Sequence, residues 1–180
     1  AMAMVEKQNG ILDNTTEYFS SYTNNYLFTI VMYYIFKMAK IMGVDYYNMA
    51  IFVNMILLDV GIYLSFCIMR KLWGSRRAAA GLLLIALCPT NYVFLHYVYT
   101  NTFSVPVVMG ILYCGISIDK EKKSISKFMW AVLFCALSVY GTYLRPTTVF
   151  CTIGVILYFF RIKTLREKWK KILLLCIIKS

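Results

Sequence analysis

The feature that most constrains this chain is a succession of long apolar runs joined by short loops. Several runs approach or exceed the 18 or so apolar residues that cross about 30 Å of hydrocarbon. The runs cover residues 47–67, 78–96, 103–118, 128–143 and 147–160, and the second is broken near its outer end by Pro89. The chain is 61% hydrophobic, whereas soluble domains are about 45–50% apolar. The sequence therefore predicts an all-α, polytopic transmembrane bundle of about five to six spans, forming one domain over residues 1–180.

Basic residues gather in alternate loops between these runs. Fourteen of the nineteen lie in three loops, namely Arg70, Lys71, Arg76, Arg77, Lys120, Lys122, Lys123, Lys127, Arg161, Lys163, Arg166, Lys168, Lys170 and Lys171. Cytoplasmic loops carry such an excess, so residues 43–46, 88–102 and 144–146 are expected to face the outside of the cell membrane. This multi-pass arrangement accounts for the net charge of +11 without nucleic acid as a partner.

Residues 1–46 are expected to form an outer loop and an interfacial helix, with the spans in residues 47–180. The apolar segment 25–42 is about 17 residues long and carries Lys37 and Lys40, which are costly inside a membrane. Its composition is typical of a helix in the lipid–water interface. Both chain ends are expected to be cut, because the start lacks signal-peptide features and KILLLCIIKS stops within a sixth run.

The six cysteines are spread one to each apolar run, without a C-x-x-C pair: Cys67, Cys88, Cys114, Cys135, Cys151 and Cys176. Metal or redox use needs ligands that are close in sequence or that converge with His and acids. The cysteines are therefore interpreted as small packing residues. We expect no cofactor, and the pattern does not support a divalent metal.

Asp59 lies near the middle of the first span, in MILLDVGIY. An ionisable group at that depth costs about 2.5–3.5 kcal/mol, so Asp59 is expected to face protein, with Asn54 about one turn away. One interpretation is a proton relay or a substrate contact. The other is a structural hydrogen bond to a neighbouring helix, or a protonated carboxyl group.

Four residues on the expected outer side are candidates for chemistry. Arg145 precedes Pro146 in a turn, and its guanidinium fits either a phosphate or lipid headgroups. His96 is a general base or an interfacial residue within an aromatic cluster. Asp13 and Glu17 are four residues apart, so they either share a helix face as catalytic carboxylates or belong to a solvated loop.

The order of short motifs along the chain resembles one family of membrane enzymes. An amphipathic segment and a span with a central Asp follow the first motif, and a span and a basic loop precede the last. The motifs are Tyr22-Thr23-Asn24-Asn25, Leu72-Trp73-Gly74, Pro89, Tyr99-Thr100-Asn101-Thr102 and Leu144-Arg145-Pro146-Thr147. This order resembles the N-terminal membrane half of bacterial GT-C glycosyltransferases. Within them it is closest to the protein-mannosyltransferase-like group with Y-P-N-N, Y-S/T-D-T and K/R-P-T patterns.

The resemblance implies a GT-C-like fold and transfer of a sugar from a polyprenyl-phosphate carrier to a glycan, lipid or protein acceptor on the outer face. Arg145 would meet the carrier phosphate. Asn101 stands where the family has Asp and is on that ground a candidate catalytic residue. The family's catalytic acid would fall at or before Ala1, which leaves Glu6, Asp13 and Glu17 as candidates for that role. The resemblance also assigns substrate binding to Tyr22, Asn24, Asn25 and Tyr99, and His96 is a further candidate for substrate binding.

Two other classes of function fit the same sequence. A transporter or flippase for a lipid-linked or anionic solute would use Asp59 and Arg145 along a path, but it should show repeat symmetry, which is absent from the sequence. A non-catalytic scaffold subunit of an envelope-glycan assembly is favoured by Asn101 in place of an acid. The membrane glycosyltransferase is the main hypothesis.

Overall fold

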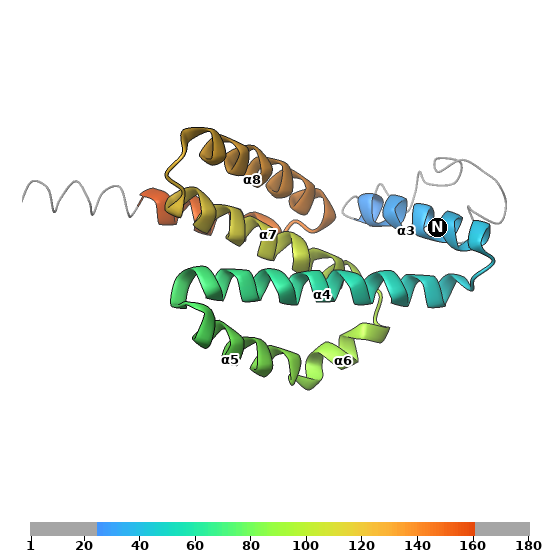
Figure 1. Cartoon of the computed structure of the whole chain (residues 1–180). Helices are drawn as coiled ribbons and strands as arrows, with labels where there is room; N and C mark the ends of the chain where they lie inside the picture. Colours follow the sequence, from blue (N-terminus) through green and yellow to red (C-terminus); the bar gives the residue numbers. More distant parts are fainter. Residues whose placement is uncertain (1–24, 161–180) are drawn as a thin grey trace, which may run out of the picture.

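The structure of the protein is a computed structural model that describes residues 25–160, except the side chains of residues 90–92 and 94. All regular secondary structure in this part of the chain is helical (Figure 1). The prediction of an all-helical chain is confirmed over the described residues. Helix labels follow Figure 1.

Three of the described helices are long and apolar enough to cross a membrane: α4 (Tyr46–Trp73), α7 (Thr100–Lys120) and α8 (Ser124–Leu144). They coincide with the runs predicted at 47–67, 103–118 and 128–143. Each helix extends past its apolar run. At the start of α4, the Asp45 carboxylate accepts hydrogen bonds from the peptide N–H groups of Tyr47 at 3.0 Å and Asn48 at 3.1 Å.

The sequence predicted a second span from residue 78 to about residue 96, broken near its outer end by Pro89. The break is confirmed, although neither half is among the helices long enough to cross a membrane. This stretch belongs to two short helices, α5 (Ser75–Ala86) and α6 (Pro89–His96), of 12 and 8 residues. Proline disfavours the interior of a helix because it lacks a peptide N–H and its ring crowds the preceding turn, but it is favoured at the first helical position. Pro89 therefore begins a new helix, and the two helices bow away from α4 (Figure 1).

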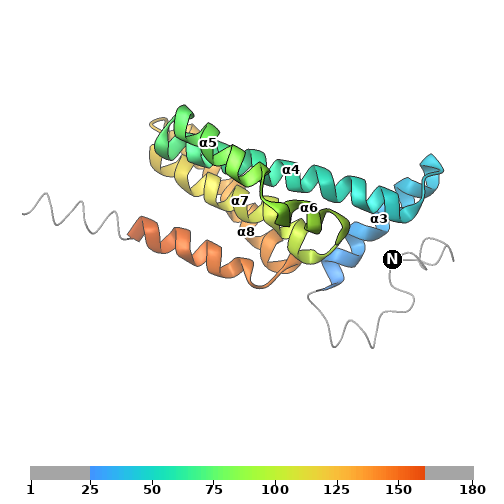
Figure 2. The same ribbon diagram turned by 90° about the horizontal axis from the view of Figure 1, so that it is seen from below.

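Helix α7 is the centre of the bundle. Over its most apolar window 56% of the residues are buried, against 22% for α4 and 6% for α8. Glycine permits the close contacts that helices need where no hydrophobic effect drives association. A Cβ atom on Gly61 would lie 2.7 Å from Val105 of α7, and one on Gly115 would lie 2.6 Å from Val155. Figure 2 shows α5 and the helix Thr148–Phe160 on opposite sides of α7.

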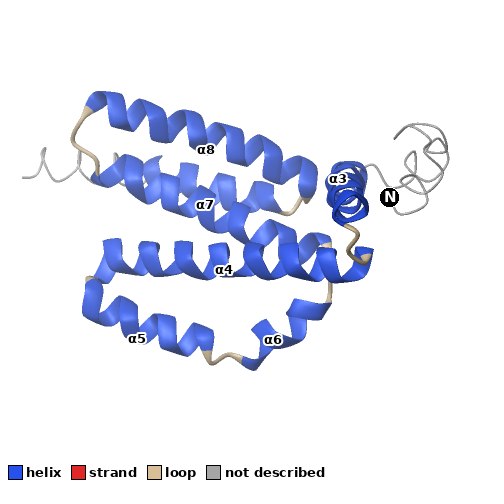
Figure 3. Ribbon diagram, turned by 45° about the vertical axis from the view of Figure 1, so that its right-hand side comes forward, coloured by secondary structure: helices blue, strands red, loops and turns tan. Residues whose placement is uncertain are grey.

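Helix α3 (Tyr26–Met42) lies across one end of this bundle. In Figure 3 it is seen almost end-on, whereas α4, α7 and α8 are seen from the side. It ends at Gly43, whose φ of 67° is the left-handed conformation that favours glycine, and the Val44 N–H bonds back to the Ala39 carbonyl at 3.0 Å. The interfacial position of this helix in a membrane stays a prediction.

The bundle has two chemically different ends. We call the end where α4 and α7 finish and α5 and α8 begin the basic end, because residues 70–77 and 120–127 lie there. The far end holds α3, the starts of α4 and α7, and the end of α8. The core runs from α3 along α7 and includes Met32, Ala39, Phe103 and Ile111. The candidate site lies at the far end.

Candidate functional site

A cavity of about 570 Å³ opens at the far end between α3, the start of α4 and the link from α6 to α7. It has an apolar wall from the helices and a polar wall from the link. The lining residues are Phe28, Met32, Phe36, Tyr47, Ala50, His96, Tyr97, Val98, Tyr99, Asn101 and Thr102. Three predicted site residues, His96, Tyr99 and Asn101, are thus brought to one cavity.

The apolar wall comes mainly from one face of α3. Phe28, Met32 and Phe36 are spaced four residues apart, which places them above one another on a helix. The Phe28 ring meets the Phe103 ring of α7 edge to face, with centroids 5.2 Å apart. This contact holds α3 against the bundle, so the wall is built on the core.

The polar wall is tied to α4 by two side chains. The Asn54 amide, fully buried, donates to the Leu95 carbonyl at 2.9 Å, and the Tyr47 hydroxyl donates to the His96 carbonyl at 3.5 Å. Both bonds go to the last turn of α6. The position of the His96 side chain on the cavity therefore depends on α4.

The start of α7 orders the other half of the polar wall. The Thr102 hydroxyl donates to the Tyr99 carbonyl at 2.8 Å, which folds the backbone back at the helix start. The Asn101 carbonyl accepts from the Ser104 hydroxyl at 2.7 Å. The side chains of Tyr99 and Asn101 stay exposed on the cavity. A phenol, a carboxamide and an imidazole, each able to bond a polar ligand, surround the opening.

Arg145 lies at the same end of the bundle but does not line the cavity. It directly follows α8 and is half-buried. Its N–H donates to the Gly141 carbonyl at 2.7 Å, and its carbonyl accepts from the Thr148 N–H at 2.9 Å. These bonds fix the turn before the helix Thr148–Phe160, as Pro146 predicts. The structure places Arg145 separately from His96, Tyr99 and Asn101.

Of the predicted residues nearest the start of the chain, only one lies within the part that the structure describes. Asp13, Glu17, Tyr22 and Asn24 lie outside the described residues. Asn25 precedes α3, and its carbonyl accepts from the Thr29 hydroxyl at 2.9 Å. Its place is therefore the start of α3, and it does not line the cavity. The roles predicted for all five residues stay predictions.

Asp59 differs from its prediction. Its side chain is exposed on α4 and contacts no polar partner among residues 25–160, whereas Asn54 is fully buried. Five residues along a helix correspond to a rotation of about 140°. The two side chains therefore point to nearly opposite sides of α4, and the prediction that Asp59 faces protein is wrong within the described bundle.

The cavity lining lacks the side chains that carry a fixed charge. No Asp, Glu, Lys or Arg side chain lines it, and no group of three or more His, Cys, Asp or Glu in residues 25–160 could hold a metal ion. The arrangement suits an amphipathic ligand, with an apolar chain against α3 and polar groups at the link. Among the described acids, Asp45 is the one closest in sequence to a lining residue, and its carboxylate caps α4.

Sequence reasoning missed Tyr47 and the wall formed by α3. Tyr47 was interpreted only as the start of a span, and nothing in the sequence links it to His96. The four-residue spacing of Phe28, Met32 and Phe36 was visible in the sequence and is the signal that could have found the wall.

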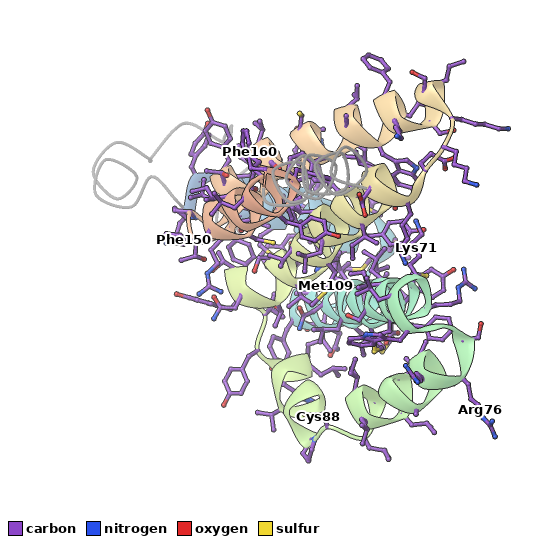
Figure 4. The ribbon with its side chains drawn as sticks, turned by 90° about the vertical axis from the view of Figure 1, so that its left-hand side faces the viewer. Lys71, Arg76, Cys88, Met109, Phe150 and Phe160 are labelled. Carbon is purple, nitrogen blue, oxygen red and sulfur yellow. The ribbon has the colours of Figure 1, made fainter. Side chains whose placement is uncertain are left out.

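A second polar cluster lies at the basic end. The Lys71 ammonium is 4.0 Å from the ring centroid of Tyr113 and 5.4 Å from that of Trp130, and it donates to the Ser117 hydroxyl at 2.5 Å. The Lys120 ammonium donates to the Lys71 carbonyl. In Figure 4, by contrast, Arg76 points away from the bundle. Lys71 was predicted as a loop cation, but here it fastens α4 to α7 and α8.

Comparison with known families gives a match over almost the entire chain. A family model described as a conserved hypothetical integral membrane protein matches residues 2–180. No curated protein and no solved structure matches the chain. The description specifies a membrane protein without a reaction, so the predicted membrane character is confirmed and the glycosyltransferase resemblance stays a prediction. The chain belongs to the family of conserved hypothetical integral membrane proteins.

Proposed function

We propose that this protein is a membrane glycosyltransferase that takes a sugar from a polyprenyl-phosphate carrier and passes it to an acceptor on the outer face of the cell membrane. The far-end cavity is the observation that carries this proposal. It brings Tyr99 and Asn101 of one GT-C-like motif, with His96 beside them, against an apolar wall suited to a lipid chain.

The charge distribution supports the assignment of the far end to the outer face. Within the described residues, the basic end collects eight cations, namely Arg70, Lys71, Arg76, Arg77, Lys120, Lys122, Lys123 and Lys127. Such an excess is typical of the cytoplasmic side. The cavity then faces outward, at the depth where α3 would meet lipid headgroups.

In this proposal the carrier chain packs on Phe28, Met32 and Phe36, and the sugar lies among His96, Tyr99 and Asn101. Transfer displaces the carrier phosphate from the anomeric carbon, so negative charge builds up on the leaving phosphate. A guanidinium stabilises such charge more in the transition state than in the ground state. Arg145, at the same end of the bundle, is proposed for this task once the carrier is bound.

The acceptor's proton must go to a base, for which a carboxylate is suited. An amide cannot accept it, so Asn101 is proposed to hold the sugar by hydrogen bonds, and Asp13 or Glu17 to act as the base. The acceptor is a glycan, a lipid or a protein.

The test is turnover by the purified full chain in lipid, with a polyprenyl-phosphate sugar as donor. Arg145→Ala is expected to lower kcat by about 10²-fold to 10³-fold, as removal of one charge-stabilising donor does. Lys37→Ala is the matched control, because Lys37 is an exposed cation on α3 at the same end. An equal loss in both variants would contradict the role of Arg145.

Binding separates this proposal from its rivals. A polyprenyl-phosphate sugar should bind more tightly than the free polyprenol, and Asn101→Ala should weaken the first and not the second. Tight binding without turnover would favour a scaffold subunit. Absence of binding would overturn the glycosyltransferase proposal.

A further inference from the structure

We propose that the face of α4 turned away from α7 docks a membrane helix of another protein, and that this helix places a basic side chain against Asp59. The face consists of Phe52, Met55, Ile56, Asp59, Val60 and Tyr63, all exposed within residues 25–160. They recur every three or four residues, which makes one continuous stripe along the helix.

The depth of Asp59 is the first step of the argument. It lies 13 residues after Tyr46 and 14 before Trp73, the ends of α4, which is about 20 Å from each end at about 1.5 Å per residue. Asp59 therefore lies close to the middle of any membrane that α4 crosses. A carboxylate facing lipid there is strongly unfavourable, and its short side chain cannot reach the headgroups as lysine does.

A movement of α4 along the membrane normal cannot remove the unfavourable exposure of the Asp59 carboxylate to lipid. A shift that brings Asp59 towards water on one side would draw Arg70 and Lys71 into the hydrocarbon. A shift the other way would draw in the cap at Asp45. Lys71 is also fastened to Tyr113 of α7, so α7 would have to move with α4. The carboxylate is held at mid-depth by charged groups at both helix ends.

Charge complementarity selects the occupant. A carboxylate in a low-dielectric surrounding is best matched by Arg, Lys or His, and guanidinium binds it in a bidentate manner. Phe52 and Tyr63, 54% and 64% exposed, flank Asp59 and offer ring faces to such a cation. The stripe thus carries one charged anchor between two aromatic side chains.

A second copy of this chain does not supply the matching group from its described helices. Their cations lie on α3, at Arg145, or at the basic end, and none is at mid-depth of α4, α7 or α8. A symmetric pair through this face would set Asp59 against another Asp59. We take the partner to be a different membrane protein with a basic residue in the middle of a helix.

The test uses the full chain in phosphatidylcholine vesicles and labelled transmembrane peptides of about 24 Leu and Ala residues. The peptides differ only at the centre, which is Arg, Leu or Glu. Energy transfer should show about tenfold tighter binding of the Arg peptide, the scale of one interhelical polar contact in a membrane. Asp59→Leu should reduce this binding to that of the Leu peptide.

The position of the carboxylate provides the control. Leu133, 43% exposed, lies mid-way along α8 on a different face. The double variant Asp59→Leu with Leu133→Asp should not recover binding of the Arg peptide. Full recovery would show that any lipid-facing acid suffices and would overturn the α4 docking face. Asp59-dependent energy transfer between two labelled copies of the chain would overturn the choice of partner.

Discussion

The hydrogen bond from Asn54 to Leu95 is expected to hold the cavity's polar wall in place. Asn54→Leu keeps a side chain of similar size but removes the amide that donates to the Leu95 carbonyl at 2.9 Å. One interhelical polar bond in a membrane bundle contributes about 0.6 kcal/mol on average and up to about 1.7 kcal/mol. A carbonyl left without its donor adds about 1–3 kcal/mol when buried. Leu95 is only half-buried, so the total loss should be about 1–2 kcal/mol.

Unfolding of the purified chain in mixed micelles by added detergent, followed by circular dichroism, measures this loss. Hydrogen exchange locates it, because residues 89–99 should exchange about five- to thirtyfold faster while α7 and α8 change little. Asn48→Leu is the matched control, since Asn48 lies in the first turn of α4 with an exposed side chain. Equal protection in wild type and Asn54→Leu would refute the anchoring role.

Two further contacts give predictions of the same kind. Gly61→Leu should destabilise the bundle by about 1–3 kcal/mol by the same unfolding assay, because a Cβ would already lie 2.7 Å from Val105. Gly154→Leu, with no neighbour within 4 Å, should leave stability unchanged. Lys71→Met should lower stability by about 1–2 kcal/mol, as the ammonium at Tyr113 is partly desolvated. Arg77→Met, at an exposed cation, should have no comparable effect.

The cavity shows which part of the candidate site could be predicted from the sequence and which part could not. Residues 88–102 were predicted to face the outside of the membrane, and His96, Tyr99 and Asn101 within them were predicted site residues. His96, Tyr99 and Asn101 do lie on one cavity. The opposite wall could not be predicted from the link, since contacts between α3 and residues about 60 positions later depend on how the helices pack.

The sequence by itself determined the membrane character, the helical class and the two different ends of the bundle. The physical reason is that these depend on local quantities: the length of an apolar run, and the cations next to it. The spans at α4, α7 and α8 follow from the same count. The run over residues 78–96 is also long enough for a span by this count. Pro89 breaks it, however, because a separate helix starts there and the chain bends.

Only the tertiary structure decided which faces of these helices meet. An apolar stripe that faces lipid and one that faces protein have the same composition, because both surroundings are apolar. Whether Asp59 and Asn54 are buried or exposed therefore depends on where α7 packs on α4. A rotation of about 140° separates their side chains. Packing therefore buries the Asn54 amide and leaves the Asp59 carboxylate exposed within the described residues.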